Sequence, residues 1–251
     1  MKLPLYFISD LHLRMDPSKE EVQRQKRLFH FFRYIAETKG TLFIVGDLFD
    51  FYFEYKDVIP KDYFHFYMEI HRLKESGVNT HFIFGNHDYW VMNFITEELM
   101  YKVYDGDFEF TINGKNFLLT HGDGLLSWDK GYRIMKKIIR SPLFVWCYRW
   151  LHPNIGYWIA KKFSGDLEHY THPDEYNRKV LEELTPFAHD KIIDGVDYVL
   201  CGHYHQATEK QINSGKLLIL GDWFTFDSYG IFDGEDLVLK RWNSKNPSSI
   251  L

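Results

Sequence analysis

A short apolar run near the amino terminus ends abruptly in a carboxylate and an imidazole, and this pattern constrains the fold more than any other. Leu5–Ile8 leads into Asp10 and His12. Four further runs end in similar residues: Thr41–Val45 precedes Gly46-Asp47, Thr80–Phe84 precedes Gly85-Asn86-His87-Asp88, Asn116–Thr120 precedes His121-Gly122-Asp123, and Val196–Leu200 precedes Gly202-His203-Tyr204-His205. Short runs rich in β-branched and aromatic residues predict buried strands. We therefore expect five strand ends to bring these polar side chains to one pocket, on loops held by a rigid support.

Helical patterns between the first three runs predict strand–helix–strand units. Apolar residues recur at helical spacing within Leu28–Ile35, with Asp16-Pro17 as the expected N-cap and first helical position and Gly40 as the C-cap. A second helix is expected to begin near Pro60 and to end at Gly77. Such units normally contain parallel strands joined by a right-handed crossover.

The rest of the chain adds antiparallel strands and further helices. Asn113-Gly114, between Phe108–Ile112 and Lys115–Thr120, predicts a type I′ hairpin. A helix opens at Pro173, and three more strand patterns precede the tail: Lys216–Leu220, Tyr229–Phe232 and Leu237–Trp242. These elements predict an α/β fold, an α/β sandwich of two sheets flanked by helices.

The segment from about residue 125 to residue 170 has a different composition, because it is helical, aromatic and basic. Lys130 to Lys162 contains eight basic residues and no Asp or Glu. Cations near an anionic lipid surface contribute about 1 kcal/mol each, and Trp and Tyr favour lipid interfaces. We interpret the segment as an inserted helical cap that binds lipid. The alternative is a solvated helical hairpin packed on the core.

The residue types at the strand ends are those that bind borderline metal ions. Imidazoles and carboxylates together suit Mn²⁺, Fe²⁺ or Zn²⁺, whereas all-oxygen sites suit Mg²⁺ or Ca²⁺. Asp10 and His12 are two positions apart, as are His203 and His205, so each pair lies on one side of an extended segment. Asp47, alone at its strand end, is the natural bridging ligand. Two cations roughly 3.5–4 Å apart lower the pKa of a nucleophilic water and clamp a phosphate for in-line attack.

Each of these residues has an ordinary explanation when taken alone. An Asp after a strand usually forms a turn, and a lone His is more often a satisfied core or surface residue than a ligand. Five such strand ends in one chain make the metal site the better explanation. Asp50, Asp88 and Asp123 keep the ordinary explanation, except as partners that orient neighbouring imidazoles. Asp222 in Gly221-Asp222-Trp223 is expected to be structural.

Composition narrows the class of protein. The chain has 251 residues, 45% of them hydrophobic, which is enough for one large domain with a core. Its net charge of −5 argues against a nucleic-acid partner. The two cysteines form no disulfide framework, and no charged leader or run of about 20 apolar residues occurs. These features predict a cytoplasmic protein.

The five motifs, in this order and over most of the chain, resemble those of the calcineurin-like metallophosphoesterases. The resemblance implies a two-sheet α/β sandwich of that type as a single domain spanning residues 1–251, with the helical cap inserted. It implies that one cation is held by Asp10, His12, Asp47 and His205, and the other by Asp47, Asn86, His121 and His203. His87 matches the residue that contacts the phosphate and stabilises or protonates the leaving group, so His87 and Asn86 are the expected catalytic residues.

Within that family the chain is most similar to the UDP-2,3-diacylglucosamine hydrolases of lipid A synthesis. The likeness lies in Ser9–Leu13, in Gly46–Phe49 and above all at the cap entry, where Asp129 and Tyr132 match positions that contact the substrate head group. It implies hydrolysis of a UDP-linked diacyl sugar lipid to UMP and 2,3-diacylglucosamine 1-phosphate. The expected substrate contacts are Asn86, His87, Asp129, Tyr132 and His203.

The same likeness implies two divalent ions, foremost Mn²⁺, and peripheral contact with the cytoplasmic face of the inner membrane, without a protein partner. His87 stands where the lipid A enzymes usually carry Arg. A related enzyme acting on another nucleotide or phospholipid-type substrate is therefore the alternative. A catalytically inactive scaffold is a further alternative, although scaffolds of this kind lose ligands and this chain retains them all.

Overall fold

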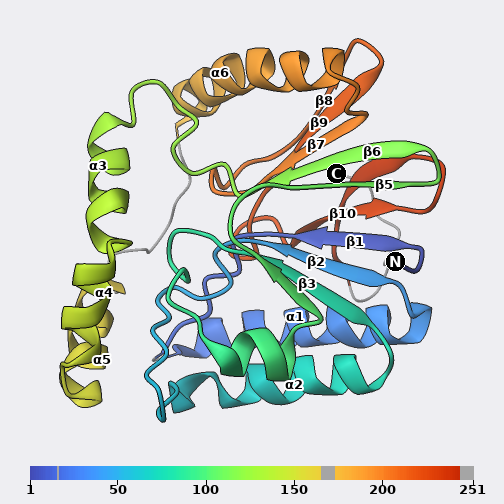
Figure 1. Ribbon diagram of the computed structural model, residues 1–251. Coiled ribbons are helices and arrows are strands. Elements are labelled where there is room, and N and C mark those ends of the chain that lie inside the picture. The colour runs from blue at the N-terminus through green and yellow to red at the C-terminus, as the bar shows by residue number, and fades with distance from the viewer. Residues whose placement is uncertain (16, 165–172, 244–251) are drawn as a thin grey trace.

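Two β-sheets packed face to face form the centre of the molecule in the computed structural model, which describes residues 1–15, 17–164 and 173–243 (Figure 1). The first sheet contains, in spatial order, β11 (Leu237–Arg241), β10 (Ser228–Phe232), β1 (Leu5–Ile8), β2 (Thr41–Val45), β3 (Asn79–Ile83) and β4 (Lys102–Tyr104). The second contains β5 (Phe108–Ile112), β6 (Lys115–Thr120), β7 (Tyr198–Cys201), β9 (Gly215–Leu220) and β8 (Ala207–Ile212). The expected two-sheet α/β sandwich is confirmed.

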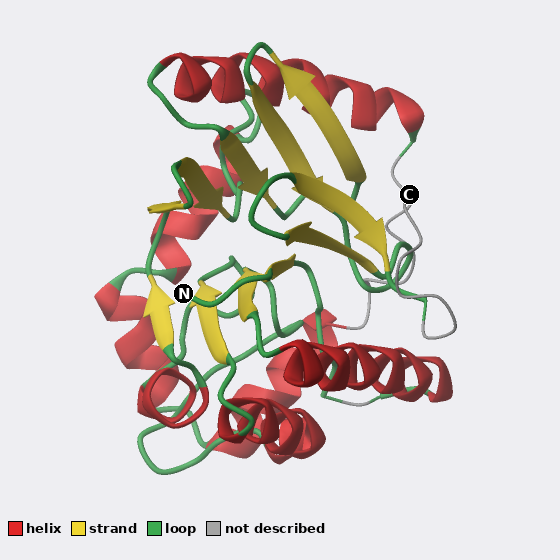
Figure 2. Ribbon diagram, turned by 90° about the vertical axis from the view of Figure 1, so that its right-hand side faces the viewer, coloured by secondary structure: helices red, strands yellow, loops and turns green. Residues whose placement is uncertain are grey.

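Helices cover the outer face of each sheet. The helices α1 (Lys19–Thr38) and α2 (Phe64–Glu75) lie on the first sheet, and α6 (Asp174–Ile193) lies on the second (Figures 1 and 2). Three more helices stand as a separate column beyond one end of the sheets: α3 (Lys130–Ile139), α4 (Pro142–Arg149) and α5 (Pro153–Ser164). Short helical turns occupy Lys61–Tyr63 and Phe94–Leu99. No described helix has both the length and the apolar character needed to cross a bilayer.

The central strands are buried on both faces, which explains their continuous apolar sequences. In β1, Leu5 and Phe7 pack between the two sheets, whereas Tyr6 and Ile8 pack under the helices of the first sheet. The same alternation runs through the neighbouring strands, because successive side chains point to opposite faces. This packing fixes the register of each strand and therefore the place where each strand ends.

The connections between β1, β2 and β3 agree with expectation. β1 pairs with β2, and β2 with β3, in parallel. The β5–β6 hairpin turns at Asn113 and Gly114, which have φ values of 49° and 74°, as a type I′ turn requires.

The expected ends of the first helix are wrong. The helix α1 begins at Lys19, and its cap is Ser18, whose side chain accepts a hydrogen bond from the Glu21 amide at 3.2 Å. Pro17 therefore precedes the helix, and Asp16 lies outside the described residues. At the other end, Lys39 rather than Gly40 takes the left-handed capping conformation, with φ 55°. The Ser18 hydroxyl accepts a hydrogen bond from an amide of the first helical turn that has no partner within the helix.

Candidate metal centre

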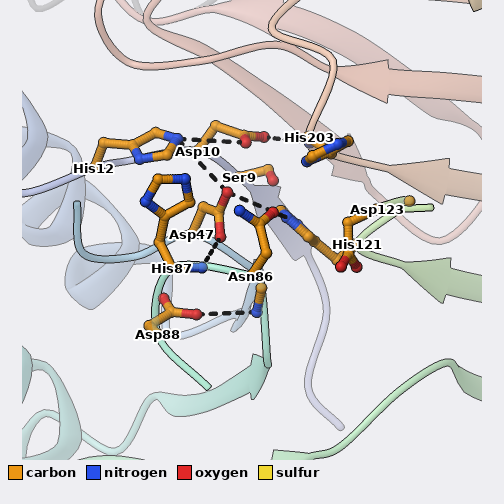
Figure 3. A network of polar contacts seen from close by, with 12 residues as sticks. Ser9, Asp10, His12, Asp47, Asn86, His87, Asp88, His121, Asp123 and His203 are labelled. Carbon is orange, nitrogen blue, oxygen red and sulfur yellow. Dashed lines mark hydrogen bonds and ion pairs between the residues drawn. The ribbon is translucent and has the colours of Figure 1, made fainter. Parts of the chain in front are cut away.

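The loops that follow five strands converge on one cluster of side chains (Figure 3). The loop after β1 supplies Asp10 and His12, the loop after β2 supplies Asp47, the loop after β3 supplies Asn86 and His87, the loop after β6 supplies His121, and the loop after β7 supplies His203 and His205. Among the described residues, three groups place one ligand atom from each member within 4.8 Å of the others: Asp10, His12 and His205; His12, Asp47 and His87; and Asp47, His121 and His203. Two of these groups take residues from both sheets.

Several of these side chains are delivered by an uncommon backbone conformation. The five residues with positive φ in the cluster are Asp10 (53°), His12 (39°), Asp47 (50°), His203 (69°) and His205 (49°). A residue other than Gly in this region costs about 1–3 kcal/mol and persists only when its surroundings hold it. Hydrogen bonds between the loops provide that support: the Asp10 amide donates to the Gly46 carbonyl at 3.2 Å, and the His12 amide to the Asp47 carbonyl at 2.9 Å.

Two glycines let the loops approach the ligands closely. A Cβ atom on Gly46 would lie 2.1 Å from His121 Nδ1, and one on Gly85 would lie 2.1 Å from Asp47 Oδ1. Neither neighbour can move without disturbing the cluster. Glycine is therefore required at both positions for steric reasons.

His121, Asp47 and Asn86 form an arrangement that calls for a positive charge. His121 Nδ1 lies 3.0 Å from the Val45 carbonyl oxygen, which can only accept, so Nδ1 carries the proton. Nε2 then faces Asn86 Oδ1 at 3.1 Å and Asp47 Oδ2 at 3.2 Å. Burial alone would lower the pKa of His121, but Asp47 and its neighbours raise that pKa to about 10. A lone pair on Nε2 would face two oxygens, so this position requires a positive charge, which a proton supplies in the ion-free protein and a divalent cation can supply in its place.

His12 shows a second such arrangement. Both ring nitrogens of His12 and Asp10 Oδ1 are buried without a hydrogen-bond partner in the described residues. His12 Nε2 lies 3.8 Å from Asp10 Oδ1 and 3.7 Å from Asp47 Oδ2, and burial lowers the pKa of His12 to about 4. The imidazole is thus in the unprotonated form that metal ions bind. Buried polar atoms without hydrogen-bond partners call for an explanation, and a bound ion is one. The side chains of Asp10 and His12 therefore fit a divalent cation.

The charges of the cluster agree with this assignment. Burial would raise the pKa of Asp10 and Asp47, but the neighbouring imidazoles hold both pKa values below the usual range. Burial lowers the pKa of His203 to about 4, so its ring is also unprotonated. Ionised carboxylates beside the neutral imidazoles of His12 and His203 are donors expected for Mn²⁺, Fe²⁺ or Zn²⁺.

His87, which was expected to contact the phosphate and the leaving group, lies within the cluster of candidate ligands beside His12 and Asp47. Its amide donates to Asp47 Oδ1 at 3.0 Å, and its Nδ1 lies 2.6 Å from the Asp50 carbonyl oxygen. Its ring stands perpendicular to that of His12, with 4.8 Å between the centroids. With Nδ1 engaged by a carbonyl, Nε2 is the nitrogen available to a phosphate or to a cation.

Three carboxylates support the ligands from behind. Asp88 accepts hydrogen bonds from the Leu48 amide at 2.6 Å and the Gly85 amide at 2.9 Å, so it joins the loops after β2 and β3. Burial, reinforced by Asp47, raises the pKa of Asp88 to about 7. Asp50 Oδ1 lies 3.9 Å from His12 Nδ1, and burial raises the pKa of Asp50 to about 6.

The third supporting carboxylate, Asp222, was expected to be structural, and the structure places it at the site. Its Oδ2 lies 3.4 Å from His205 Nδ1, and its Oδ1 accepts the amides of Phe224 and Thr225. A carboxylate in this position orients an imidazole toward a cation. The signal that could have found Asp222 is the same one used for Asp47, a Gly-Asp pair directly after a strand.

The two expected cap-entry residues lie in different surroundings. The Tyr132 hydroxyl donates to Asp123 Oδ2 at 2.7 Å, and the Tyr132 ring is centred 5.8 Å from that of His203. Asp129 directly precedes α3, and the charged groups that act on it are Arg133 and Glu183. Tyr132 therefore adjoins the cluster, whereas a contact between Asp129 and substrate stays a prediction.

The chain is similar in sequence to known enzymes. UDP-2,3-diacylglucosamine hydrolase of Porphyromonas gingivalis is 31% identical over 96% of this chain and 98% of its own length. The enzyme of the same name from Vibrio atlanticus is 23% identical over 96% of this chain and 98% of its own. Vacuolar protein sorting 29 from Cryptosporidium parvum matches with a TM-score of 0.46 and 14% identity, covering 97% of this chain and 93% of its own.

Residues 3–207 match the family described as calcineurin-like phosphoesterase. This confirms the resemblance seen in the strand-end motifs, and the His and Asp groups support divalent-metal binding. The chain belongs to the calcineurin-like phosphoesterase family and is a metal-dependent hydrolase.

Proposed function

We propose that the protein hydrolyses the diphosphate of UDP-2,3-diacylglucosamine, giving UMP and 2,3-diacylglucosamine 1-phosphate in lipid A synthesis. Support comes from relatives that bear this enzyme name over nearly the whole chain. Further support comes from the helix beside the metal centre, which offers contacts for both the charged and the acyl parts of such a lipid.

The observation that carries the proposal is the inverted polarity of α3. Its site-facing side contains Tyr132 and Lys136, and Arg140 caps its carboxyl end; all three are partly buried beside the loops of the metal centre. Its outer side contains Ile134, Met135 and Ile138, which are 62%, 50% and 57% exposed. A helix of a water-soluble domain normally buries its apolar side. A lipid with an anionic head would contact both sides of this helix.

Exposed apolar residues continue over the neighbouring helices. Trp146, Trp150 and Trp158 are 59%, 75% and 63% exposed, and Leu143 is 70% exposed. Large exposed apolar surfaces mark sites of lipid or protein contact, and Trp favours the lipid interface. We infer that this cap binds the acyl chains and contacts the cytoplasmic face of the inner membrane. Residues 165–170, the last part of the expected cap, lie outside the described residues.

The residues divide the chemistry between them. Asp10, His12, Asp47 and His205 would hold one divalent ion, and Asp47, Asn86, His121 and His203 a second, with Mn²⁺ the foremost candidate. Such a pair lowers the pKa of the attacking water and neutralises charge on the phosphoryl oxygens. Asp47 belongs to two of the three described ligand groups and is the candidate for the shared ligand.

His87 would act on the leaving group. Attack at the α-phosphorus breaks its bond to the bridging oxygen, so that the water oxygen remains in UMP and negative charge develops on the bridging oxygen, which leaves with the sugar 1-phosphate. His87 is anchored through Nδ1 to the Asp50 carbonyl, which leaves Nε2 to bind or protonate that oxygen.

The test compares two substrates with the same diphosphate. The purified, Mn²⁺-loaded protein is assayed with UDP-2,3-diacylglucosamine in detergent micelles and with water-soluble UDP-N-acetylglucosamine. Release of UMP from the lipid at least about 100-fold faster is expected, because only the lipid contacts the outer side of α3. Equal rates would favour a soluble nucleotide substrate, and metal binding without turnover of any phosphoester would favour a scaffold.

A further inference from the structure

We propose that Lys136 and Arg140 form a second anion subsite, which binds the phosphoryl group of a diphosphate that is not held at the metal centre. Asp123 positions the two cations. The assignment of the natural ligand as a UDP-linked lipid rests on the proposed function, but recognition of two linked phosphoryl groups does not.

Helical spacing brings the participating residues to one side of α3. Tyr132, Lys136 and Arg140 follow at intervals of four, which places them above one another. The side chains of Lys136 and Arg140 are only 25% and 18% exposed. Lys137, next in sequence, is exposed. The helix therefore directs two of its cations toward the loops of the metal centre and at least one toward solvent.

Asp123 links these side chains to the loop after β6. Its Oδ2 lies 2.5 Å from Lys136 Nζ and 4.0 Å from an Arg140 Nη atom, and it accepts the Tyr132 hydroxyl at 2.7 Å. Asp123 follows the candidate ligand His121 by two positions. A displacement of Lys136 or Tyr132 would therefore move the loop that carries His121, and a displacement of that loop would move Lys136 and Tyr132.

Arg140 reaches the loop after β3 from the far end of the helix. Its guanidinium donates to the Gly85 carbonyl at 2.8 Å and lies 4.2 Å from the centroid of the Tyr89 ring. Gly85 is in contact with Asp47 and precedes Asn86. Arg140 Nε is buried and has no hydrogen-bond partner among the described residues. Arg140 is thus anchored beside the cluster by one hydrogen bond and one ring contact, and its charge is not matched by these contacts.

The positive charges of Lys136 and Arg140 outnumber the carboxylates that pair with them. Within the described part of the chain, Asp123 is the only carboxylate within ion-pair distance of Lys136 or Arg140. Two cations therefore share one carboxylate. A diphosphate diester carries one negative charge on each phosphoryl group, and the metal centre accommodates one of them. The surplus positive charge suits the other, because Arg and Lys are strong phosphate binders.

A purely structural role would give the same contacts, so the test must separate fixation of the helix from recognition of phosphate. Isothermal titration calorimetry on the Mn²⁺-loaded full chain measures the dissociation constants of methylenediphosphonate and methylphosphonate, and metal content is checked after each titration. The wild type is expected to bind the diphosphonate more tightly. Arg140→Gln and Lys136→Gln should each weaken diphosphonate binding by about 10- to 100-fold, the range for a charged hydrogen bond, and change methylphosphonate binding by less than about threefold. Arg140→Lys should recover part of the loss.

Lys137→Gln is the matched control, since it removes the same charge from the exposed side of the same helix. It should alter neither constant. Equal losses for both ligands in the Arg140 and Lys136 variants would show that these residues only hold the helix, and unchanged diphosphonate binding would show that they contact no second phosphoryl group. Either result overturns the proposal. If selectivity for the diphosphonate is present but the UDP-linked lipid is not hydrolysed, the proposed function fails and the subsite stands.

Discussion

Replacement of Asp47 by Asn tests the centre most directly, because it removes one charge and little volume. The structure gives a measure of the field that this carboxylate exerts. The rise in the pKa of His121 from 6.5 to about 10 stabilises one positive charge at Nε2 by roughly 5 kcal/mol, despite burial. Asp47 makes the largest favourable contribution, with smaller ones from Asp10 and Asp123. If Asp47 provides half of these roughly 5 kcal/mol, its replacement by Asn costs about 2–3 kcal/mol. That energy corresponds to a loss of about 100-fold in affinity for a single charge at this position. A carboxylate attracts a divalent ion more strongly than a single charge, so we expect a loss of about 100-fold or more.

The assay is metal content at controlled free Mn²⁺. Protein stripped with chelator is dialysed against buffered Mn²⁺, and bound metal is counted by mass spectrometry alongside hydrolysis of a generic phosphodiester. We expect about two ions per wild-type chain, at most one in Asp47→Asn, and a loss of nearly all turnover. Asp236→Asn is the control, because Asp236 pairs with Lys216 and belongs to none of the three ligand groups. Two ions bound at wild-type affinity in Asp47→Asn would refute the assignment of Asp47 as the shared ligand.

Four other variants test separate parts of the structure. His87→Ala should keep its metal and lower the rate by about 10²–10⁴-fold, so loss of metal would instead make His87 a ligand. Asp222→Ala should weaken metal binding by about 10- to 100-fold, measured by competition with a chelator, since His205 loses the carboxylate that orients it. Trp146→Ser with Trp150→Ser should weaken sedimentation with anionic vesicles by about 1 kcal/mol for each Trp, and unchanged binding would remove the cap from the lipid contact. His81→Phe should make stability less dependent on pH. Burial lowers the pKa of His81 from 6.5 to about 4, so between these pH values the unfolded chain binds more protons than the folded one, and stability falls by up to about 3 kcal/mol as pH falls. Urea titrations should find a smaller fall in the variant.

Much of the fold could be predicted because its signals are local. The parallel β1–β2–β3 units and the hairpin at Asn113-Gly114 follow from apolar periodicity and turn chemistry within short windows. β8 was not predicted, since Ala207–Ile212 contains Thr, Glu, Lys and Gln and lies at the edge of its sheet, where one side stays accessible. An edge strand of this kind has no strong apolar pattern.

The candidate ligands could be found because each stands directly after a strand, and parallel neighbours end at the same edge of a sheet. Arg140 follows no strand, and although Asp222 does, its sequence position does not distinguish a carboxylate that orients a ligand from one that forms a turn. The role of Asp222 depends on its 3.4 Å approach to His205 Nδ1, and that of Arg140 on its contact with a carbonyl 55 positions earlier in the chain. Such distances arise only from the packing of the two sheets and the cap.

The division of the ligands between the two sheets has a consequence for the protein without its ions. Each of two candidate cations would bind ligands from loops of both sheets. These ion–ligand bonds would lie where the apolar packing between the sheets ends and the buried charged residues begin. Removal of the ions by a chelator should loosen the contact between these loops first. Amide hydrogen exchange should then accelerate in the loops after β1, β2, β6 and β7 before it does in the strands themselves. Loading with metal is therefore expected to strengthen the contact between the two sheets as well as to complete the site.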